Sequence, residues 1–201
     1  MASTSTASHP ALEHDQRVIL HGVSWEDYER LLAIRGERSG ARIAYLRGEV
    51  ELMSPSRGHE GIKSLLGRLV EAYAEERGLS LNAYGSWTIK ERREERGAEP
   101  DECYVLGAED ALRPDLAIEV VWTSGGLDKL EIYRGLGVRE VWFWHDGRIA
   151  VHALEGERYS TRARSALFPD LDLDLVAELA GRADQTQAVR ALRARLRGEP
   201  G

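Results

Sequence analysis

Apolar residues recur along the chain at spacings typical of amphipathic helices. The clearest stripe lies between Gly58 and Gly78, where a helix is predicted to bury one face and to end at the second glycine. Its apolar positions follow the 3, 4, 7 spacing: Ile62, Leu65, Leu66, Leu69, Val70 and Tyr73. Further helices are predicted over residues 24–36, 127–137, 171–182 and 185–198.

Shorter patterns predict strands between these helices. Residues 42–54 are predicted to form a hairpin turning at Arg47–Gly48, and residues 140–154 a second hairpin turning at Asp146–Gly147. Single strands are predicted within residues 79–92, 100–107 and 113–123, with a charged loop over 90–100. This order of elements predicts an α/β fold in which one central mixed β-sheet is flanked by helices.

Composition places the chain among single-domain globular proteins. It has 201 residues, of which 42% are apolar and 30% charged. Residues 1–15 have the composition of a disordered N-terminal tail, which leaves residues 16–201 as one domain. The chain shows no signal peptide and no membrane-spanning stretch, and its single cysteine, Cys103, excludes an internal disulfide and a Cys-based zinc cluster. A cytoplasmic location without membrane contact is therefore expected.

The charge balance is acidic, with a formal net charge of -7. This argues against a protein that lives by non-specific nucleic-acid binding, but it leaves a local basic groove open. Arg92, Arg93 and Arg96 alternate with glutamates and are interpreted as a solvated loop. The basic C-terminal segment RALRARLRG is interpreted as a surface or oligomer-forming helix rather than a DNA contact, so a homodimer is left open.

One acidic residue interrupts the most apolar strand. In the run PDLAIEVVWT, residues 114–123, both strand parities are apolar from Leu116 to Trp122 except at Glu119. A strand that is apolar on both faces is usually covered on both faces. The buried carboxylate of Glu119 must then be paired, hydrogen-bonded, protonated or bound to a metal.

Two further residues are predicted to lie near Glu119. Asp101 follows a proline at the start of the preceding strand, and its side chain lies beside that of Glu119 if the two strands are neighbours. Lys129 shares the 0, 3, 4, 7 stripe of the next helix with Ile132, Tyr133 and Leu136, so it lies on the apolar face of the first turn. These charges form either a catalytic cluster or a structural ion pair with a capping aspartate, and the pattern alone favours neither.

Several segments together resemble a known family. The segments PDECYV, RPDLAIEV and DKLEIYRGLGVREVWFWHDGRIAVHAL, preceded by RGEVELMSPSRGHEGIKSLLGRL, are similar in order and spacing to the Uma family of restriction endonucleases. That family belongs to the PD-(D/E)XK nuclease-like superfamily. The resemblance covers about residues 24–160 and implies a restriction-endonuclease-like fold.

The resemblance also implies roles for the three charged residues. Asp101 matches the motif aspartate, Glu119 matches the second acidic position, and Lys129 matches a lysine that this family carries on the following helix. The superfamily's usual lysine position is occupied by Val121. The loop over residues 123–126 departs from the family, because it is short and lacks a Ser-Pro-Ser/Thr run.

These residue types suit metal-dependent hydrolysis of a phosphodiester. Two carboxylates, Asp101 and Glu119, are expected to hold Mg²⁺, with Mn²⁺ as the alternative ion. The metal activates a bound water and stabilises developing charge, and Lys129 is expected to orient that water or neutralise the phosphate. The expected partner is DNA.

Four other residues are candidate accessories to this site. His59 matches the family's histidine and is expected either to contact the site or to bond locally at its helix start. Glu49 and Glu51 share one strand face, where either a third carboxylate or, as the favoured interpretation, a solvated face is expected. Asp115 shares the parity of Glu119 and competes with Asp101 for the metal. The aromatic residues Trp122, Trp142, Phe143 and Trp144 are interpreted as core.

Two functions from different classes follow. The first is a Mg²⁺-dependent endonuclease acting on DNA. The second is a non-catalytic, nuclease-fold protein that serves as a binding or oligomeric interaction module. The presence of Asp101, Glu119 and Lys129 together favours the first, whereas the acidic net charge and the short loop favour the second.

Overall fold

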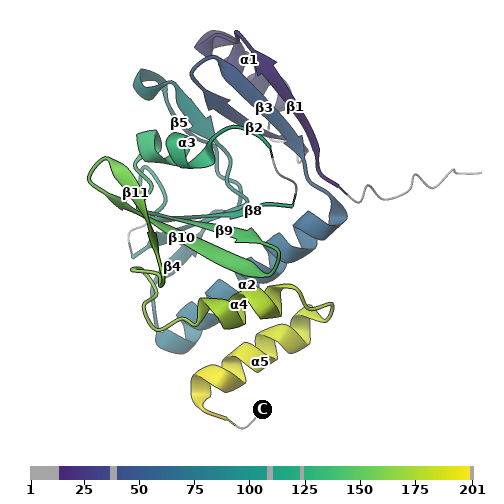
Figure 1. The fold of residues 1–201 in the computed structure, drawn as a ribbon, viewed down its shortest axis with the longest axis vertical. Coiled ribbons are helices and arrows are strands. Elements are labelled where there is room, and N and C mark those ends of the chain that lie inside the picture. Colours follow the sequence, from purple (N-terminus) through teal and green to yellow (C-terminus); the bar gives the residue numbers. More distant parts are fainter. Residues whose placement is uncertain (1–13, 37–39, 108–110, 123–124, 200–201) are drawn as a thin grey trace, which may run out of the picture.

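The computed structural model describes residues 14–36, 40–107, 111–122 and 125–199, and these residues form a mixed α/β fold with two sheets and five α-helices (Figure 1). The strands are β1 (Gln16–His21), β2 (Arg42–Leu46), β3 (Glu49–Ser54), β4 (Leu81–Ala83), β5 (Ile89–Glu91), β6 (Arg96–Ala98), β7 (Glu102–Leu106), β8 (Leu116–Val120), β9 (Glu140–His145), β10 (Arg148–Glu155) and β11 (Arg158–Arg162). The helices are α1 (Trp25–Arg35), α2 (Arg57–Arg77), α3 (Lys129–Leu136), α4 (Leu173–Ala180) and α5 (Gln185–Arg197), with a 3-10 turn at Arg92–Glu94.

The larger sheet has the strand order β11-β10-β9-β8-β7-β4. Its strands pair antiparallel except β8 and β9, which run parallel, so this is the predicted central mixed sheet. The smaller sheet has the order β1-β3-β2-β6-β5 and is antiparallel throughout. The sequence did not predict this second sheet, because β5 and β6 have only three residues each and lie at or within the charged segment 90–100.

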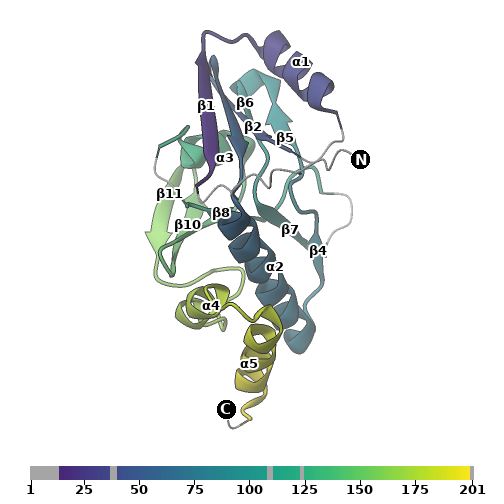
Figure 2. The ribbon, with the colours of Figure 1, turned by 90° about the vertical axis from the view of Figure 1, so that its right-hand side faces the viewer.

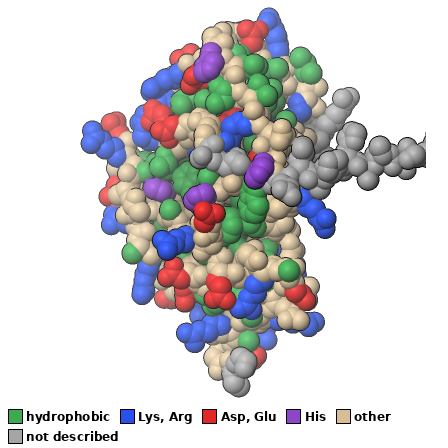
Figure 3. Space-filling model, turned by 45° about the vertical axis from the view of Figure 1, so that its right-hand side comes forward, with side chains coloured by type: hydrophobic (Ala, Val, Ile, Leu, Met, Phe, Trp, Pro, Cys, Tyr) green, Lys and Arg blue, Asp and Glu red, His purple; other side chains and the backbone are tan. Residues whose placement is uncertain are grey.

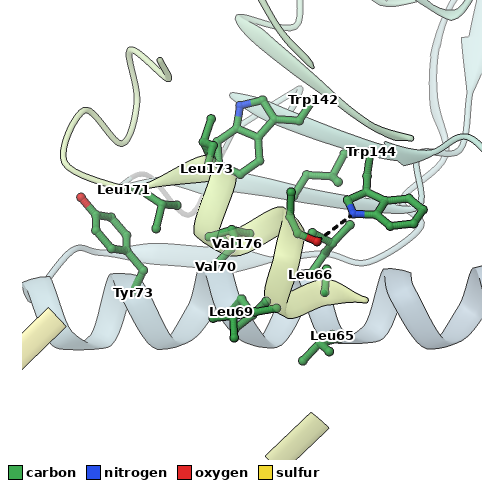
Figure 4. Close-up of a cluster of buried hydrophobic side chains, with 14 of the residues drawn as sticks. Leu65, Leu66, Leu69, Val70, Tyr73, Trp142, Trp144, Leu171, Leu173 and Val176 are labelled. Carbon is green, nitrogen blue, oxygen red and sulfur yellow. Dashed lines mark hydrogen bonds between the residues drawn. The ribbon is translucent and has the colours of Figure 1, made fainter. Parts of the chain in front are cut away.

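Helix α2 covers one face of the larger sheet, and α4 and α5 pack beside it (Figure 2). The predicted stripe of α2 is buried there against side chains of the sheet and of α4, including Trp142, Trp144 and Val176 (Figure 4). The Trp144 indole donates a hydrogen bond to the Ala177 carbonyl at 3.4 Å. Since this core also contains Ile118 and Val120, one parity of β8 faces α2.

The other face of β8 is covered by α3 and the smaller sheet. Ala117 of β8 packs there with Ile132 and Leu136 of α3 and with Ala44 of β2. The two-sided apolar pattern of β8 therefore has its predicted cause, which is a cover on each face.

Helix ends lie close to where the sequence placed them. The Ser24 hydroxyl accepts a hydrogen bond from the Asp27 N–H at 3.1 Å and caps α1. Gly78 ends α2 in the left-handed conformation, which glycine adopts without steric cost. Among the described residues, none of the helices has the length and apolarity required to cross a membrane.

The basic helix α5 lies against acidic residues of α2. Arg193 contacts Glu75 and Glu76, and Arg197 contacts Glu76 at 2.6 Å. These ion pairs hold the pKa of Glu76 at about 2, because hydrogen bonds from the two guanidinium groups stabilise its carboxylate. Two of the positive charges of α5, those of Arg193 and Arg197, are therefore neutralised by ion pairs within the chain.

Arg96 corrects the interpretation of residues 90–100 as a solvated loop. Its side chain is almost completely buried on β6. The Arg96 guanidinium donates to the Glu131 carbonyl at 2.9 Å and to the Glu131 carboxylate at 2.6 Å. It lies against Gly135 of α3, where a β-carbon would overlap the Arg96 side chain. A buried guanidinium thus joins the smaller sheet to α3.

Three other expectations differ from the structure at its margins. Residues 1–13 of the expected tail lie outside the described residues, but Asp15 is described and buried. Strands β1 and β11 were not predicted. Trp122, expected in the core, is 36% exposed, because it follows the end of β8 and stacks on Trp144.

Two glycine substitutions test the surroundings of α2 and of β6. Gly61 lies within α2 with open space around its Cα, so Gly61→Ala is expected to raise the free energy of unfolding by about 0.5–1 kcal/mol. A β-carbon at Gly97 of β6 would overlap the buried Tyr28 ring and hydroxyl, so Gly97→Ala is expected to lower it by about 1–3 kcal/mol. Urea denaturation of both variants provides the measurement, and equal effects would contradict the described contact of β6 with α1.

Candidate active site

The pairing of β7 with β8 sets the position of the two predicted carboxylates. Glu102 pairs with Ile118 and Cys103 with Ala117, so the register continued by one residue sets Asp101 opposite Glu119. Residues that lie directly opposite in an antiparallel pair point to the same face of the sheet. Both side chains are buried.

Asp101 uses both of its carboxylate oxygens. Oδ2 accepts a hydrogen bond from the Val120 N–H at 2.6 Å, which fastens the start of β7 to the end of β8. Oδ1 contacts the Arg42 guanidinium of β2 and lies 3.0 Å from His59 Nε2. A buried carboxylate therefore meets one cation, one imidazole and one backbone N–H.

His59 lies in the first turn of α2, between two aspartates. Its Nδ1 lies 2.9 Å from Asp15 Oδ2, and its Nε2 lies 3.2 Å from Arg42 Nη1. Burial disfavours the imidazolium and lowers the pKa of His59, although Asp15 opposes this effect. We therefore assign a neutral ring in which Nδ1–H donates to Asp15, while Arg42 Nη1 donates to both Nε2 and the neighbouring Asp101 Oδ1, two acceptors that lie 3.0 Å apart.

Asp15 joins the N-terminal segment to this cluster. Its Oδ1 accepts the Ser56 N–H at 2.7 Å, just before α2 begins. Burial acts to raise the pKa of Asp15, but the hydrogen bonds from Ser56 and His59 outweigh it, so the pKa lies below its usual range. Asp15 is thus held ionised.

Glu119 has its own set of partners on α3. Its Oε1 lies 3.4 Å from Lys129 Nζ and accepts a hydrogen bond from the Tyr133 hydroxyl. Complete burial raises the pKa of Tyr133 well above its usual range, and the Glu119 charge adds to this effect. The predicted proximity of Lys129 to Glu119 is therefore present in the structure. Lys129 begins α3, whose N-cap Asp128 accepts the Glu131 N–H at 3.0 Å.

A cavity of about 230 Å³ opens onto Glu119 and Lys129. Its wall includes Glu51 and Arg17 from the smaller sheet and Phe143 from β9. The cavity therefore lies between the two sheets, with charges of both signs in its wall. The surface shows the same mixture, because Lys and Arg side chains are interspersed with Asp and Glu over the face of the molecule shown in Figure 3.

Glu51 corrects the interpretation of its strand face as solvated. It is almost completely buried, because residues 125–127 cover it, and its Oε2 accepts the Leu127 N–H at 2.9 Å. The accessory candidates Glu49 and Asp115 are not brought to the site. Glu49 pairs with His21 at 2.7 Å near the hairpin turn, whereas Asp115 accepts the Leu106 N–H and pairs with Arg139.

Three residues of this cluster were not predicted as site residues: Asp15, Arg42 and Tyr133. For Glu51, the sequence favoured a solvated face over the alternative of a third carboxylate. Only Tyr133 carried a usable signal, since it lies four residues after Lys129 on the same helix stripe. Arg42 begins β2, whose sequence shows no alternation, and Glu51 lies in an alternating strand whose covered face depends on a distant loop. Asp15 lies in a polar segment with no periodic pattern.

The donor atoms suit a hard divalent cation rather than a soft one. Asp101 and Glu119 supply carboxylate oxygens, and the buried thiol of Cys103 bonds to the Gly85 carbonyl instead. Across the described ranges, no group of three or more His, Cys, Asp or Glu side chains is arranged to hold a metal. Mg²⁺ is commonly held by one or two carboxylates, with waters and substrate phosphates completing its shell. A site built from these two carboxylates would therefore need water and substrate phosphates to complete the shell of Mg²⁺.

Comparison with known proteins identifies the same class of fold. The family model Uma2, described as "Putative restriction endonuclease", matches residues 25–186. A crystal structure described as a "putative nuclease belonging to DUF820" from Anabaena variabilis is similar, with a TM-score of 0.51 at 13% sequence identity. The similarity covers 84% of this chain and 98% of that protein. No curated protein matches the chain.

Two tyrosines provide a test of the charge on Glu119. Tyr133 donates to the carboxylate, whereas Tyr159 donates at 2.6 Å to the neutral Val138 carbonyl. Hydrogen bonds to charged groups contribute more, so Tyr133→Phe is expected to cost about 1.5–3 kcal/mol and Tyr159→Phe about 0.5–1.5 kcal/mol. Thermal and urea unfolding at neutral pH provide the comparison, and an equal cost would contradict the stronger hydrogen bond expected between Tyr133 and Glu119.

Proposed function

Because the chain belongs to the Uma2 family, described as putative restriction endonucleases, we propose that it is a metal-dependent endonuclease that hydrolyses phosphodiester bonds in DNA. One observation carries the proposal: two buried carboxylates on paired strands, one of them bonded to a lysine at the wall of a cavity. Buried charges in a cavity are costly to stability and are often kept for chemistry. A cytoplasmic location and a homodimer stay predictions.

Asp101 and Glu119 would hold the cation, which we propose is Mg²⁺ with Mn²⁺ as a substitute. When bound, such an ion lowers the pKa of a coordinated water and neutralises phosphate charge. In the structure each carboxylate is compensated by a cation of the chain, Asp101 by Arg42 and Glu119 by Lys129. The site is thus charge-balanced by its own side chains.

Lys129 is proposed to act on the scissile phosphate. Its Nζ lies at the cavity wall, where an ammonium can donate to a phosphate oxygen or orient the attacking water. Glu119 holds this ammonium and Tyr133 holds Glu119, so the side chain is positioned before substrate arrives. Substrate that displaces water from the cavity would strengthen each of these interactions.

A second candidate function is a non-catalytic module that retains the nuclease fold. The charge distribution favours it, because the net charge is -7 and two arginines of α5, Arg193 and Arg197, are paired with α2. Both candidate functions predict weak binding of this protein to the phosphate backbone of DNA. The two functions differ in their need for the carboxylate pair, since only an endonuclease requires Asp101 and Glu119 for turnover.

The first test is cleavage of a supercoiled plasmid with Mg²⁺ or Mn²⁺. The wild-type chain is expected to nick or linearise it, and Asp101→Asn is expected to abolish cleavage. Asp146→Asn, at a turn position that is 90% exposed, serves as the matched control and should cleave as wild type does. Absence of cleavage with either metal, together with no Mn²⁺ binding by calorimetry, would favour the non-catalytic function.

The second test separates the two roles of Lys129. Lys129→Met keeps most of the side-chain bulk and removes the charge. If Lys129 acts on the phosphate, kcat should fall by about 10²–10³, the usual loss for one electrostatic donor, while Mn²⁺ binding persists. If it only pairs with Glu119, the variant should lose about 3–5 kcal/mol of stability, the usual cost of breaking a buried pair. Full cleavage by the variant would remove Lys129 from the reaction.

A further inference from the structure

Strand β1 precedes the family-matched region and forms one edge of the smaller sheet. Most of its side chains are exposed or half-buried. Asp15, just before the strand, and Arg17, within it, instead turn inward. Each contacts a different part of the candidate active site.

Asp15 determines how His59 faces Asp101. It accepts two hydrogen bonds, one from the Ser56 N–H at 2.7 Å and one from the imidazole at 2.9 Å. Because the Nδ1–H of His59 donates to Asp15, the ring lone pair lies on Nε2. This atom faces Arg42 and Asp101. The carboxylate thereby fixes both the tautomer and the ring orientation, as partners of metal-site histidines commonly do.

Arg17 contacts the segment that leads into α3. Its Nη1 donates to the Gly125 carbonyl, and its Nε lies 3.3 Å from Glu51 Oε2. The same Glu51 oxygen accepts the Leu127 N–H at 2.9 Å. Arg17 and Glu51 together hold both ends of the segment 125–127, which ends two residues before Lys129.

Gly126 shows how closely this segment is held. A β-carbon there would overlap Glu51 Oε2 and would lie 3.2 Å from the Arg17 guanidinium carbon. Gly126 also has a φ of 132°, which side-chain-bearing residues rarely adopt. The backbone thus passes directly over the ion pair, so a shift of Arg17 would move the approach to Lys129.

We propose that Asp15 and Arg17 are positioning residues of the nuclease site. Asp15 orients His59 against Asp101, and Arg17 with Glu51 orients the segment that places Lys129. This inference rests on the proposed function and extends it, because it assigns part of the site's geometry to a strand outside the family-matched residues. Loss of such supporting contacts typically lowers activity or metal affinity about 10- to 100-fold.

Asp15→Asn tests the first half. Asparagine has one acceptor oxygen where Asp15 uses two, so either one of the two hydrogen bonds is lost or the asparagine N–H donates to Nδ1 of the other tautomer. The ¹⁵N shifts of His59 are expected to move from the Nδ1–H to the Nε2–H tautomer. Cleavage kcat is expected to fall about 10- to 100-fold with a smaller change in KM, and Mn²⁺ affinity is expected to weaken.

Arg17→Met tests the second half. It keeps the aliphatic bulk and removes the donors to Gly125 and Glu51. The Leu127 amide is expected to exchange with deuterium faster, and kcat is expected to fall about 10- to 100-fold. Arg17→Lys keeps the charge without the two-point contact, so its kcat should lie between those of Arg17→Met and the wild type.

Matched substitutions at exposed positions serve as controls. Asp146→Asn and Arg30→Met, whose side chains are 90% and 74% exposed, should leave cleavage, tautomer and exchange unchanged. Cleavage by Asp15→Asn and Arg17→Met within twofold of wild type would overturn the proposal. If the wild type itself does not cleave, the proposed function fails separately. The His59 tautomer and the Leu127 exchange rate then decide the inference, and unchanged values in both variants would overturn it.

Discussion

The antiparallel pairing of β7 with β8 is the constraint on which the rest of the site depends. It sets Asp101 opposite Glu119 within a sheet covered on both faces. Two carboxylates cannot be buried there without compensation, because each loses its hydration. Arg42 and the Val120 N–H stabilise the Asp101 carboxylate, and Lys129 of α3 stabilises the Glu119 carboxylate. The starts of α2 and α3 are arranged around this requirement.

Local pattern was sufficient for much of the fold. The stripe of α2, both predicted hairpins and the two-sided apolarity of β8 depend on residues close in sequence, and each is present. The smaller sheet depends on pairing between distant segments. Its strands β5 and β6 are too short to show a period, and only their neighbours β2 and α3 make Arg96 an interior residue.

The candidate site shows the same division. Glu119 and Lys129 were conspicuous because each charge interrupts an apolar pattern. Glu51 was not conspicuous. The alternation shows that Glu51 and Val50 point to opposite faces of the strand, but it does not show which face is covered. The cover comes from residues 125–127, more than 70 positions later. Asp15 interrupts no pattern, so its burial follows only from where β1 pairs with β3.

The packing of Gly135 against Arg96 has an evolutionary consequence. The Arg96 side chain occupies the space that a β-carbon at position 135 would take, and its guanidinium satisfies Glu131. Replacing the glycine alone would displace the arginine, and shortening the arginine alone would leave a void beside α3. Homologous sequences are therefore expected to exchange these two residues together, with the charge at position 131 changing in step. The joint between the smaller sheet and α3 should thus appear among relatives as one inherited unit of three positions.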